Sequence, residues 1–258
     1  MLLKLMLGPF FYKLYTESIN TLASETPVSQ PPIFYLPVVE RCIQYTVEME
    51  GLIMCGIAGR IMRGIGAVGR DLVNLMDAQE HRGADSTGFA VYGPPRDVGY
   101  VLRGIGFDKI QMDADLADFT NILRDHGSDL LSDPKIVQDA NKHYCFRVEI
   151  KDPTDLAAWV ADADELTDRI EIQSCGRSLE IIKDMGGSAE VAEKHSVHDM
   201  QGTHGLGHAR LATESSVLPN ASHPFWARPF SDVAIVHNGQ ITDYFTWRIN
   251  WSVEVIVS

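Results

Sequence analysis

The residues best able to do chemistry in this sequence are a cysteine, an arginine and an Asn-Gly pair. Cys55 offers a thiol, whose thiolate form is a strong nucleophile. Arg210 offers a guanidinium that can grip a carboxylate through two parallel hydrogen bonds. Asn238 and Gly239 can aim a side-chain amide and a backbone N–H at a developing oxyanion. Together these groups predict a site for nucleophilic chemistry at an amide or ester carbonyl.

Each of these residues also has a structural explanation when it is taken alone. Cys55 could be a small buried core residue, because free cysteine is among the most buried residue types. Arg210 could form a structural salt bridge. Asn238-Gly239 could be a hairpin turn, for which this dipeptide is a strong signal.

Cys55 directly follows Met54, and this position bears on its reactivity. If Met54 were the initiator and were removed, the Cys55 α-amine, with an unperturbed pKa of about 8, could act as the general base. In the sequence as written the Cys55 nitrogen is an amide and cannot do so. We expect that Met54 is the true start or, less favoured, that a propeptide is cleaved before Cys55. The chain as written is expected to be inactive.

The histidines do not predict a metal site. His204 and His208 have the HxxxH spacing, which places two ligands on one helical face. Gly205 and Gly207 lie between them and disfavour a helix there. No HExxH or CxxC motif occurs in the sequence. We therefore expect loop histidines bound to backbone groups, and no metal ligands.

Hydrophobic patterning predicts a mixture of strands and helices. An amphipathic helix is expected over 68–79, with Val68, Leu72, Leu75, Met76 and Gln79 on one face. The strand at 87–93 is expected to form a hairpin with 98–106, and a loop is expected to hold Arg210. Further strands are expected at 55–62, 143–150 and 232–239, and further helices at 109–127 and 152–170, the last with an Asp or Thr N-cap.

Five motifs, in order along the chain, resemble those of class II glutamine amidotransferase domains. They are MCGIAG (54–59), HRGADSTGFAVYG (81–93), GHARLAT (207–213), NASHP (220–224) and IVHNGQITDY (235–244). The resemblance implies an α+β fold of the Ntn-hydrolase type, a four-layer αββα sandwich. The long segment at about 106–202 looks most like an insert of the stand-alone amidotransferase subunits related to glutamate synthase and N-methylglutamate synthase.

Carried over by position, the resemblance implies a role for each chemical group. Cys55 would attack the side-chain amide of L-glutamine, giving a γ-glutamyl thioester and ammonia, and water would then release glutamate. Arg210 would clamp the α-carboxylate of glutamine. Asn238 and Gly239 would form the oxyanion hole. No metal and no organic cofactor is implied for this reaction.

The remaining motif positions would shape the pocket. Thr213 and the backbone near Leu211 would help to hold the substrate. His81, Arg82 and Asp85 match a loop of the family that supports the pocket. The ammonia would pass to a partner synthase domain or subunit, whose acceptor this sequence does not identify.

The resemblance divides the chain into parts. Residues 1–53 are expected to be a leader outside the fold, and 54–246 the amidotransferase domain with a small α+β insert at about 106–202. Residues 247–258 depart from the family pattern, so we expect an aberrant tail and a sandwich truncated at its C-terminus. A catalytically inactive regulatory subunit of the same fold is the alternative, and hydrolysis of another amide is a weaker one.

Composition limits the partners. The chain has 258 residues with 22 Lys and Arg against 35 Asp and Glu, a formal net charge of −13. This acidity disfavours nucleic acid as a partner, because phosphate binding needs a basic face. No long apolar run predicts a membrane span, and four cysteines do not make a disulfide scaffold. We expect a cytoplasmic protein with reduced Cys145 and Cys175, although the sequence leaves a local disulfide open.

Overall fold

A computed structural model describes residues 42–44, 55–80, 85–138, 142–166, 168–211 and 219–239. Two antiparallel sheets form the body of the segment Val39–Ser258, which is one compact unit in its own right. A third, two-stranded sheet pairs β10 (Phe225–Trp226) with β11 (Ala234–Ile235).

The larger sheet has five strands in the order β1-β2-β9-β3-β8. Every neighbouring pair in it is antiparallel. The strands are β1 (Cys42–Gln44), β2 (Gly56–Gly66), β3 (Ser86–Tyr92), β8 (Leu179–Met185) and β9 (Gly202–Arg210). Strand β1 falls within the segment predicted as a leader, and it pairs with β2.

The smaller sheet has four strands in the order β5-β6-β4-β7 and is also antiparallel. Its strands are β4 (Tyr100–Gly106), β5 (Lys135–Gln138), β6 (Tyr144–Ile150) and β7 (Ile170–Gly176). Most of this sheet comes from the segment predicted as an insert, which also supplies β8 to the larger sheet.

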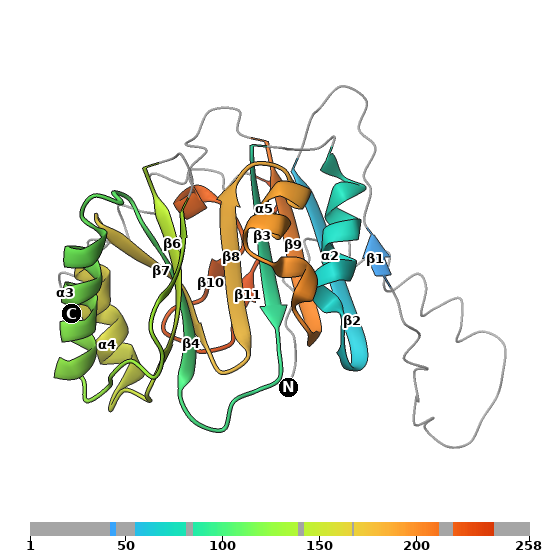
Figure 1. Cartoon of the computed structure of the whole chain (residues 1–258). Helices are drawn as coiled ribbons and strands as arrows, with labels where there is room; N and C mark the ends of the chain where they lie inside the picture. The colour runs from blue at the N-terminus through green and yellow to red at the C-terminus, as the bar shows by residue number, and fades with distance from the viewer. Residues whose placement is uncertain are drawn as a thin grey trace, which may run out of the picture. The chain divides into compact units, whose positions relative to one another are not determined.

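Helices cover one face of each sheet (Figure 1). Helices α2 (Val68–Asp77) and α5 (Ser188–Lys194), with the short turn η3 (Val197–Asp199), pack on the five-stranded sheet in one apolar cluster. Helices α3 (Met112–Asp125) and α4 (Leu156–Ala163), with η2 (Asp164–Leu166), pack on the four-stranded sheet. The second cluster also takes in Ala90 and Ile181 of the larger sheet, so it joins the two sheets.

The structure confirms a mixed fold of helices and antiparallel sheets, as α+β predicts. Its assignment to the Ntn-hydrolase sandwich stays a prediction. No helix in the described part of the chain is both long enough and apolar enough to cross a membrane.

Several local predictions are confirmed. Helix α2 buries Val68, Leu72 and Met76 completely, as its 3.6-residue period requires. Helix α4 begins after the N-cap Asp155, whose carboxylate accepts hydrogen bonds from the backbone N–H groups of Ala157 and Ala158.

The predicted hairpin of 87–93 with 98–106 is wrong. Strand β3 pairs with β8 and β9, whereas β4 pairs with β6 and β7 in the other sheet. The Gly93-Pro94-Pro95 segment after β3 carries the chain from one sheet to the other. Proline has no backbone N–H, so these residues are poor ladder partners, and the link is a crossover rather than a tight turn.

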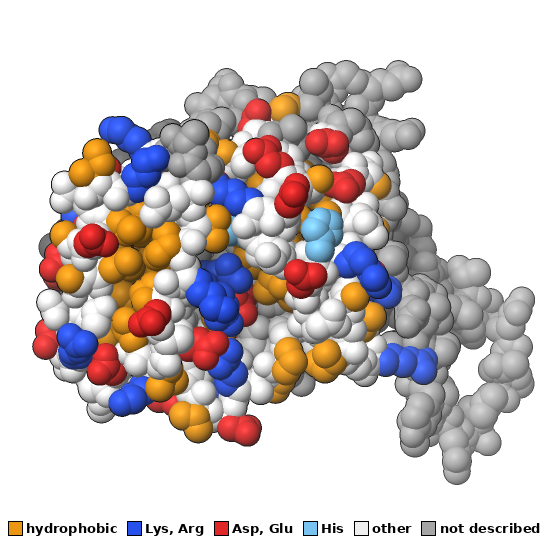
Figure 2. Space-filling model, in the orientation of Figure 1, with side chains coloured by type: hydrophobic (Ala, Val, Ile, Leu, Met, Phe, Trp, Pro, Cys, Tyr) orange, Lys and Arg blue, Asp and Glu red, His pale blue; other side chains and the backbone are white. Residues whose placement is uncertain are grey.

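A polar seam connects the two sheets where β8 meets β4 and β6. Glu180 of β8 accepts hydrogen bonds from Arg103 of β4, at 2.8 Å, and from Arg147 of β6, at 2.9 Å. Arg96 and Arg147 both bind Glu149 on the same side. In the orientation of Figure 1, basic and acidic side chains gather in the middle of the visible face (Figure 2).

Candidate active site

Three strand ends meet at one end of the five-stranded sheet and bring the predicted chemical groups together. Gly56 of β2 pairs with Ala209 of β9, so Cys55 and Arg210 stand at the next position on neighbouring strands. On the other side of β9, Arg210 pairs with Ser86 of β3. The antiparallel register thus collects motifs that are far apart in the sequence.

Asn238 lies beside Cys55. Its side-chain Nδ2 donates a hydrogen bond to the Cys55 carbonyl oxygen at 2.5 Å. The next residue, Gly239, has φ of +156°, a value that disfavours residues with a Cβ. A Cβ there would also lie 3.1 Å from the His237 ring. Glycine therefore lets the backbone turn directly after the asparagine amide.

Arg210 is the last residue of β9, so the prediction that it lies in a loop is wrong. Strand β9 runs through Gly205 and Gly207. A Cβ at either glycine would press on an α2 side chain, Leu72 or Met76, so glycine here allows α2 to pack on the strand. The Arg210 Nη1 donates to the Ala221 carbonyl oxygen at 3.0 Å, and the residue is buried. Its guanidinium is therefore held at the strand end.

The segment that receives Arg210 packs directly on β3. It contains η4 (Pro219–Ala221), and the Ser222 hydroxyl lies 2.7 Å from the Ser86 hydroxyl. A Cβ at Gly88 would stand 2.1 Å from the His223 carbonyl oxygen. Gly88 is thus required for this close approach, which is why the NASHP and STG motifs lie against each other.

Three histidines, one from each of the GHARLAT, NASHP and IVHNGQITDY motifs, form a group close to this site. The ring of His223 lies 5.0 Å from that of His208 and 6.3 Å from that of His237. His208 is buried. Burial, together with the neighbouring His223, lowers the pKa of His208 to about 3. Burial likewise lowers the pKa of His223 to about 4, so both rings are neutral at pH 7.

The loop residue Asp85 also reaches this end of the sheet. Its N–H donates to the Arg210 carbonyl at 3.2 Å, and its carbonyl accepts from Gly186 at 3.1 Å. Leu211 follows β9 directly and is half-buried. Thr213, His81 and Arg82 lie outside the described residues.

The structure therefore assembles Cys55, Arg210, Asp85 and the Asn238-Gly239 pair at one place. The period-2 and period-3.6 patterns do not predict this arrangement, because it depends on strand register. In the sequence, the three histidines are visible only as members of three separate motifs. Their proximity in space could not be predicted from those motifs.

Comparison with known proteins gives relatives over most of the chain, although no protein-family profile matches it. A protein provisionally described as a glutamine amidotransferase, from Methanothermobacter thermautotrophicus, is 33% identical over 207 residues, covering 78% of this chain and 65% of that protein. The glutamine amidotransferase-like protein GlxB of Rhizobium meliloti is 30% identical over 198 residues, covering 76% of this chain and 62% of GlxB. Glutamine–fructose-6-phosphate aminotransferase of Methanococcus maripaludis is 34% identical over 76 residues, 28% of this chain and 12% of that enzyme.

These similarities support a glutamine amidotransferase domain in this chain. The chain spans less than two thirds of the length of the first two relatives.

Proposed function

We propose that this chain is a class II glutamine amidotransferase domain. It hydrolyses L-glutamine to glutamate and delivers the ammonia to a synthase domain or subunit. The observation that carries the proposal is the contact of Asn238 with Cys55 beside Arg210, at the meeting point of three strand ends. A nucleophile, an amide donor and a carboxylate clamp in one place form the set that glutamine hydrolysis needs.

Arg210 selects glutamine through its α-carboxylate. A guanidinium carries five N–H donors in a rigid fork, which fits a carboxylate better than an ammonium does. The bond to the Ala221 carbonyl fixes the orientation of this fork. Leu211, Thr213 and the loop of His81, Arg82 and Asp85 complete the walls of the pocket in this proposal.

The chemistry proceeds in two steps. The Cys55 Sγ attacks the side-chain carbonyl carbon of glutamine, while the free Cys55 α-amine takes the thiol proton and passes it to the leaving ammonia. Water then attacks the γ-glutamyl thioester, and glutamate leaves as the thiol re-forms. An asparagine amide has two N–H groups. One holds the Cys55 carbonyl, and the other serves the oxyanion together with the Gly239 N–H.

The experiment compares the full chain with a chain that begins at Met54. Both are incubated with glutamine, glutamate release is measured, and the N-terminal residue of each is determined by sequencing. Glutamate release is expected only where Cys55 is the first residue. Cys55→Ala should abolish release, and Cys175→Ala, at a fully buried thiol away from this site, should not.

A folded chain with a free Cys55 that releases no glutamate would overturn the catalytic proposal. That result would favour the regulatory subunit of the same fold. Glutamate release by the full chain with Met1 still in place would instead overturn the role of the α-amine.

A further inference from the structure

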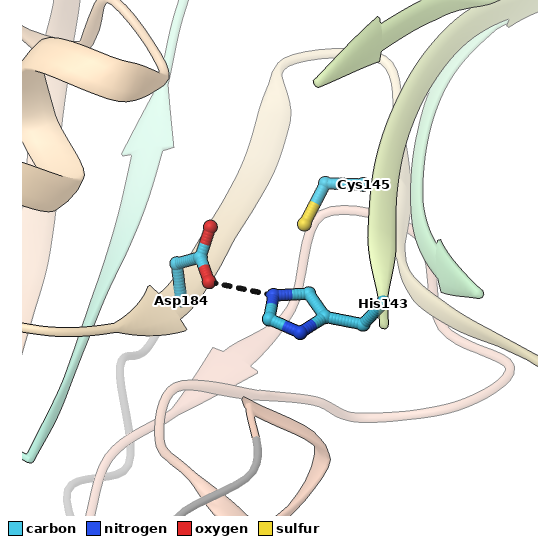
Figure 3. A group of neighbouring side chains, drawn as sticks. All are labelled: His143, Cys145 and Asp184. Carbon is cyan, nitrogen blue, oxygen red and sulfur yellow. Dashed lines mark hydrogen bonds and ion pairs between the residues drawn. The ribbon is translucent and has the colours of Figure 1, made fainter. Parts of the chain in front are cut away.

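A second group of side chains, all of types that can bind a metal ion, lies away from Cys55, in the seam between the two sheets. His143 immediately precedes β6, and Cys145 is the second residue of that strand. Because side chains alternate along a strand, residues 143 and 145 share one face. Asp184 of β8 points toward them, and the ligand atoms of the three side chains lie within 4.8 Å of one another (Figure 3).

The carboxylate of Asp184 is completely buried and surrounded by donors. His143 Nε2 lies 2.9 Å from Oδ1, while His195 Nε2 and Lys194 Nζ lie 2.8 and 2.5 Å from Oδ2. Burial alone would raise the pKa of Asp184, but the hydrogen bonds from His143, His195 and Lys194 hold it well below its usual range.

We propose that His143, Cys145 and Asp184 bind a zinc ion. Imidazole, thiolate and carboxylate are the three ligand types that Zn²⁺ takes in proteins. With bonds of about 2.0–2.3 Å, ligand atoms in a tetrahedral site stand roughly 3.5 Å apart. The three ligand atoms, which lie within 4.8 Å of one another, therefore approach by up to about 1 Å on binding the ion. The ion replaces the Cys145 thiol proton, which goes to water. It also replaces the hydrogen between His143 Nε2 and Asp184 Oδ1, so that His143 binds through Nε2 with its one remaining proton on Nδ1.

The two groups on Oδ2, His195 and Lys194, support the ligand Asp184 and do not bind the ion themselves. His195 and Lys194 hold the far oxygen of Asp184 and so orient Oδ1 toward His143 and Cys145, as carboxylate partners commonly do around zinc.

The consequence of binding is structural. His143 and Cys145 belong to the four-stranded sheet and Asp184 to the five-stranded one, so the ion ties the sheets together. Asp184 is also two residues from Gly186, whose N–H donates to the Asp85 carbonyl. The site thus braces the strand that ends beside the candidate active site, without any part in amide hydrolysis.

The test uses the full chain with Cys55→Ala, which removes the half-buried thiol of the candidate active site. Co²⁺ alone is added, because a cobalt–thiolate bond gives a charge-transfer band in the near ultraviolet. We expect one Co²⁺ per chain, displaced by Zn²⁺. Cys145→Ala should remove the band, whereas Cys175→Ala, the matched control at a fully buried cysteine, should keep it.

Thermal unfolding gives a second readout that does not depend on a thiol. Zn²⁺ should raise the melting temperature, and His143→Gln should cancel the rise. Lys194→Met should raise the zinc dissociation constant about tenfold, because it removes a group that orients Asp184. Circular dichroism checks that each variant is folded. A folded chain that shows neither the band nor the temperature rise overturns the proposal, as does a band that survives Cys145→Ala.

Discussion

The side-chain amide of Asn238 donates a hydrogen bond to the backbone carbonyl of Cys55, which lies 183 positions earlier in the chain. This contact places an amide donor against the backbone of the candidate nucleophile. The next residue, Gly239, has φ of +156°. The catalytic proposal depends on this pairing more than on any other contact.

Asn238→Ala should lower kcat for glutamine hydrolysis by about 10²–10³-fold, since that is the usual cost of removing one oxyanion donor. KM should change little, because the donor acts mainly on charge that develops in the transition state. Steady-state kinetics on a chain with a free Cys55 measure both constants. Asn74→Ala, at an exposed asparagine of α2, is the control, and an unchanged kcat in Asn238→Ala would contradict the oxyanion role.

Arg210→Lys should raise KM for glutamine about 10–100-fold, because lysine keeps the charge but loses the bidentate fork. The hydrogen bond to the Ala221 carbonyl is also altered. A glutamine analogue without the α-carboxylate separates the two effects. It should be hydrolysed equally, and poorly, by both proteins if Arg210 clamps that carboxylate.

The control for this prediction is Arg70→Lys, at an exposed arginine of α2. Its kinetics should match those of the unchanged chain. Loss of analogue hydrolysis in Arg210→Lys would show instead that the arginine supports the fold of the strand end.

The sequence allows the elements to be predicted better than their pairing. The 3.6-residue pattern of α2 and the N-cap of α4 are local signals, and both are confirmed. The partner of β3 is not local. Gly93-Pro94-Pro95 looks like a turn between two apolar strands. Strand β3 nevertheless pairs with β8 and β9, which are distant in the sequence. Because both faces of the sheet are buried, the apolar pattern of a strand does not identify its neighbours.

The candidate site shows the same difference between local signals, which the sequence contains, and long-range pairing, which it does not reveal. The motifs identify Cys55, Arg210 and Asn238 as residue types, but their meeting at one end of the sheet follows from the register of β2, β9 and β3. The two glycines before His208, Gly205 and Gly207, look like loop residues in the sequence. In the structure they make room for α2 against β9, and helix packing therefore decides their role.

Glu180→Gln should lower the free energy of unfolding by about 2–4 kcal/mol. The carboxylate lies between Arg103 and Arg147, and all three side chains are at most one-fifth exposed. Removing one member of such a group leaves the opposite charges poorly solvated. Urea unfolding measures the change.

Its matched control is Asp129→Asn, which breaks the exposed pair with Arg124 at 3.5 Å. That change should stay within about 0.5 kcal/mol, as surface ion pairs contribute little. Equal effects of the two variants would mean that the seam between the sheets is not a stabilising contact.

Stability should fall between pH 7 and pH 4.5 because of His208 and His223. Their pKa values in the folded chain, about 3 and about 4, lie below the ordinary value of 6.5. Below pH 6.5 the unfolded chain therefore binds protons that the folded chain does not, and acid favours unfolding. The fully buried His208 alone should contribute about 1.4 kcal/mol per pH unit in this range.

Urea unfolding at several pH values checks this dependence. His208→Gln should reduce the slope of the unfolding free energy against pH by about 1.4 kcal/mol per pH unit, because glutamine does not titrate. This holds even if the stability of the variant at pH 7 differs. His198→Gln, at an exposed histidine, should leave the slope unchanged. A slope that His208→Gln does not alter would place the proton uptake elsewhere and would show that the His208 ring is charged, or solvated, in the folded chain.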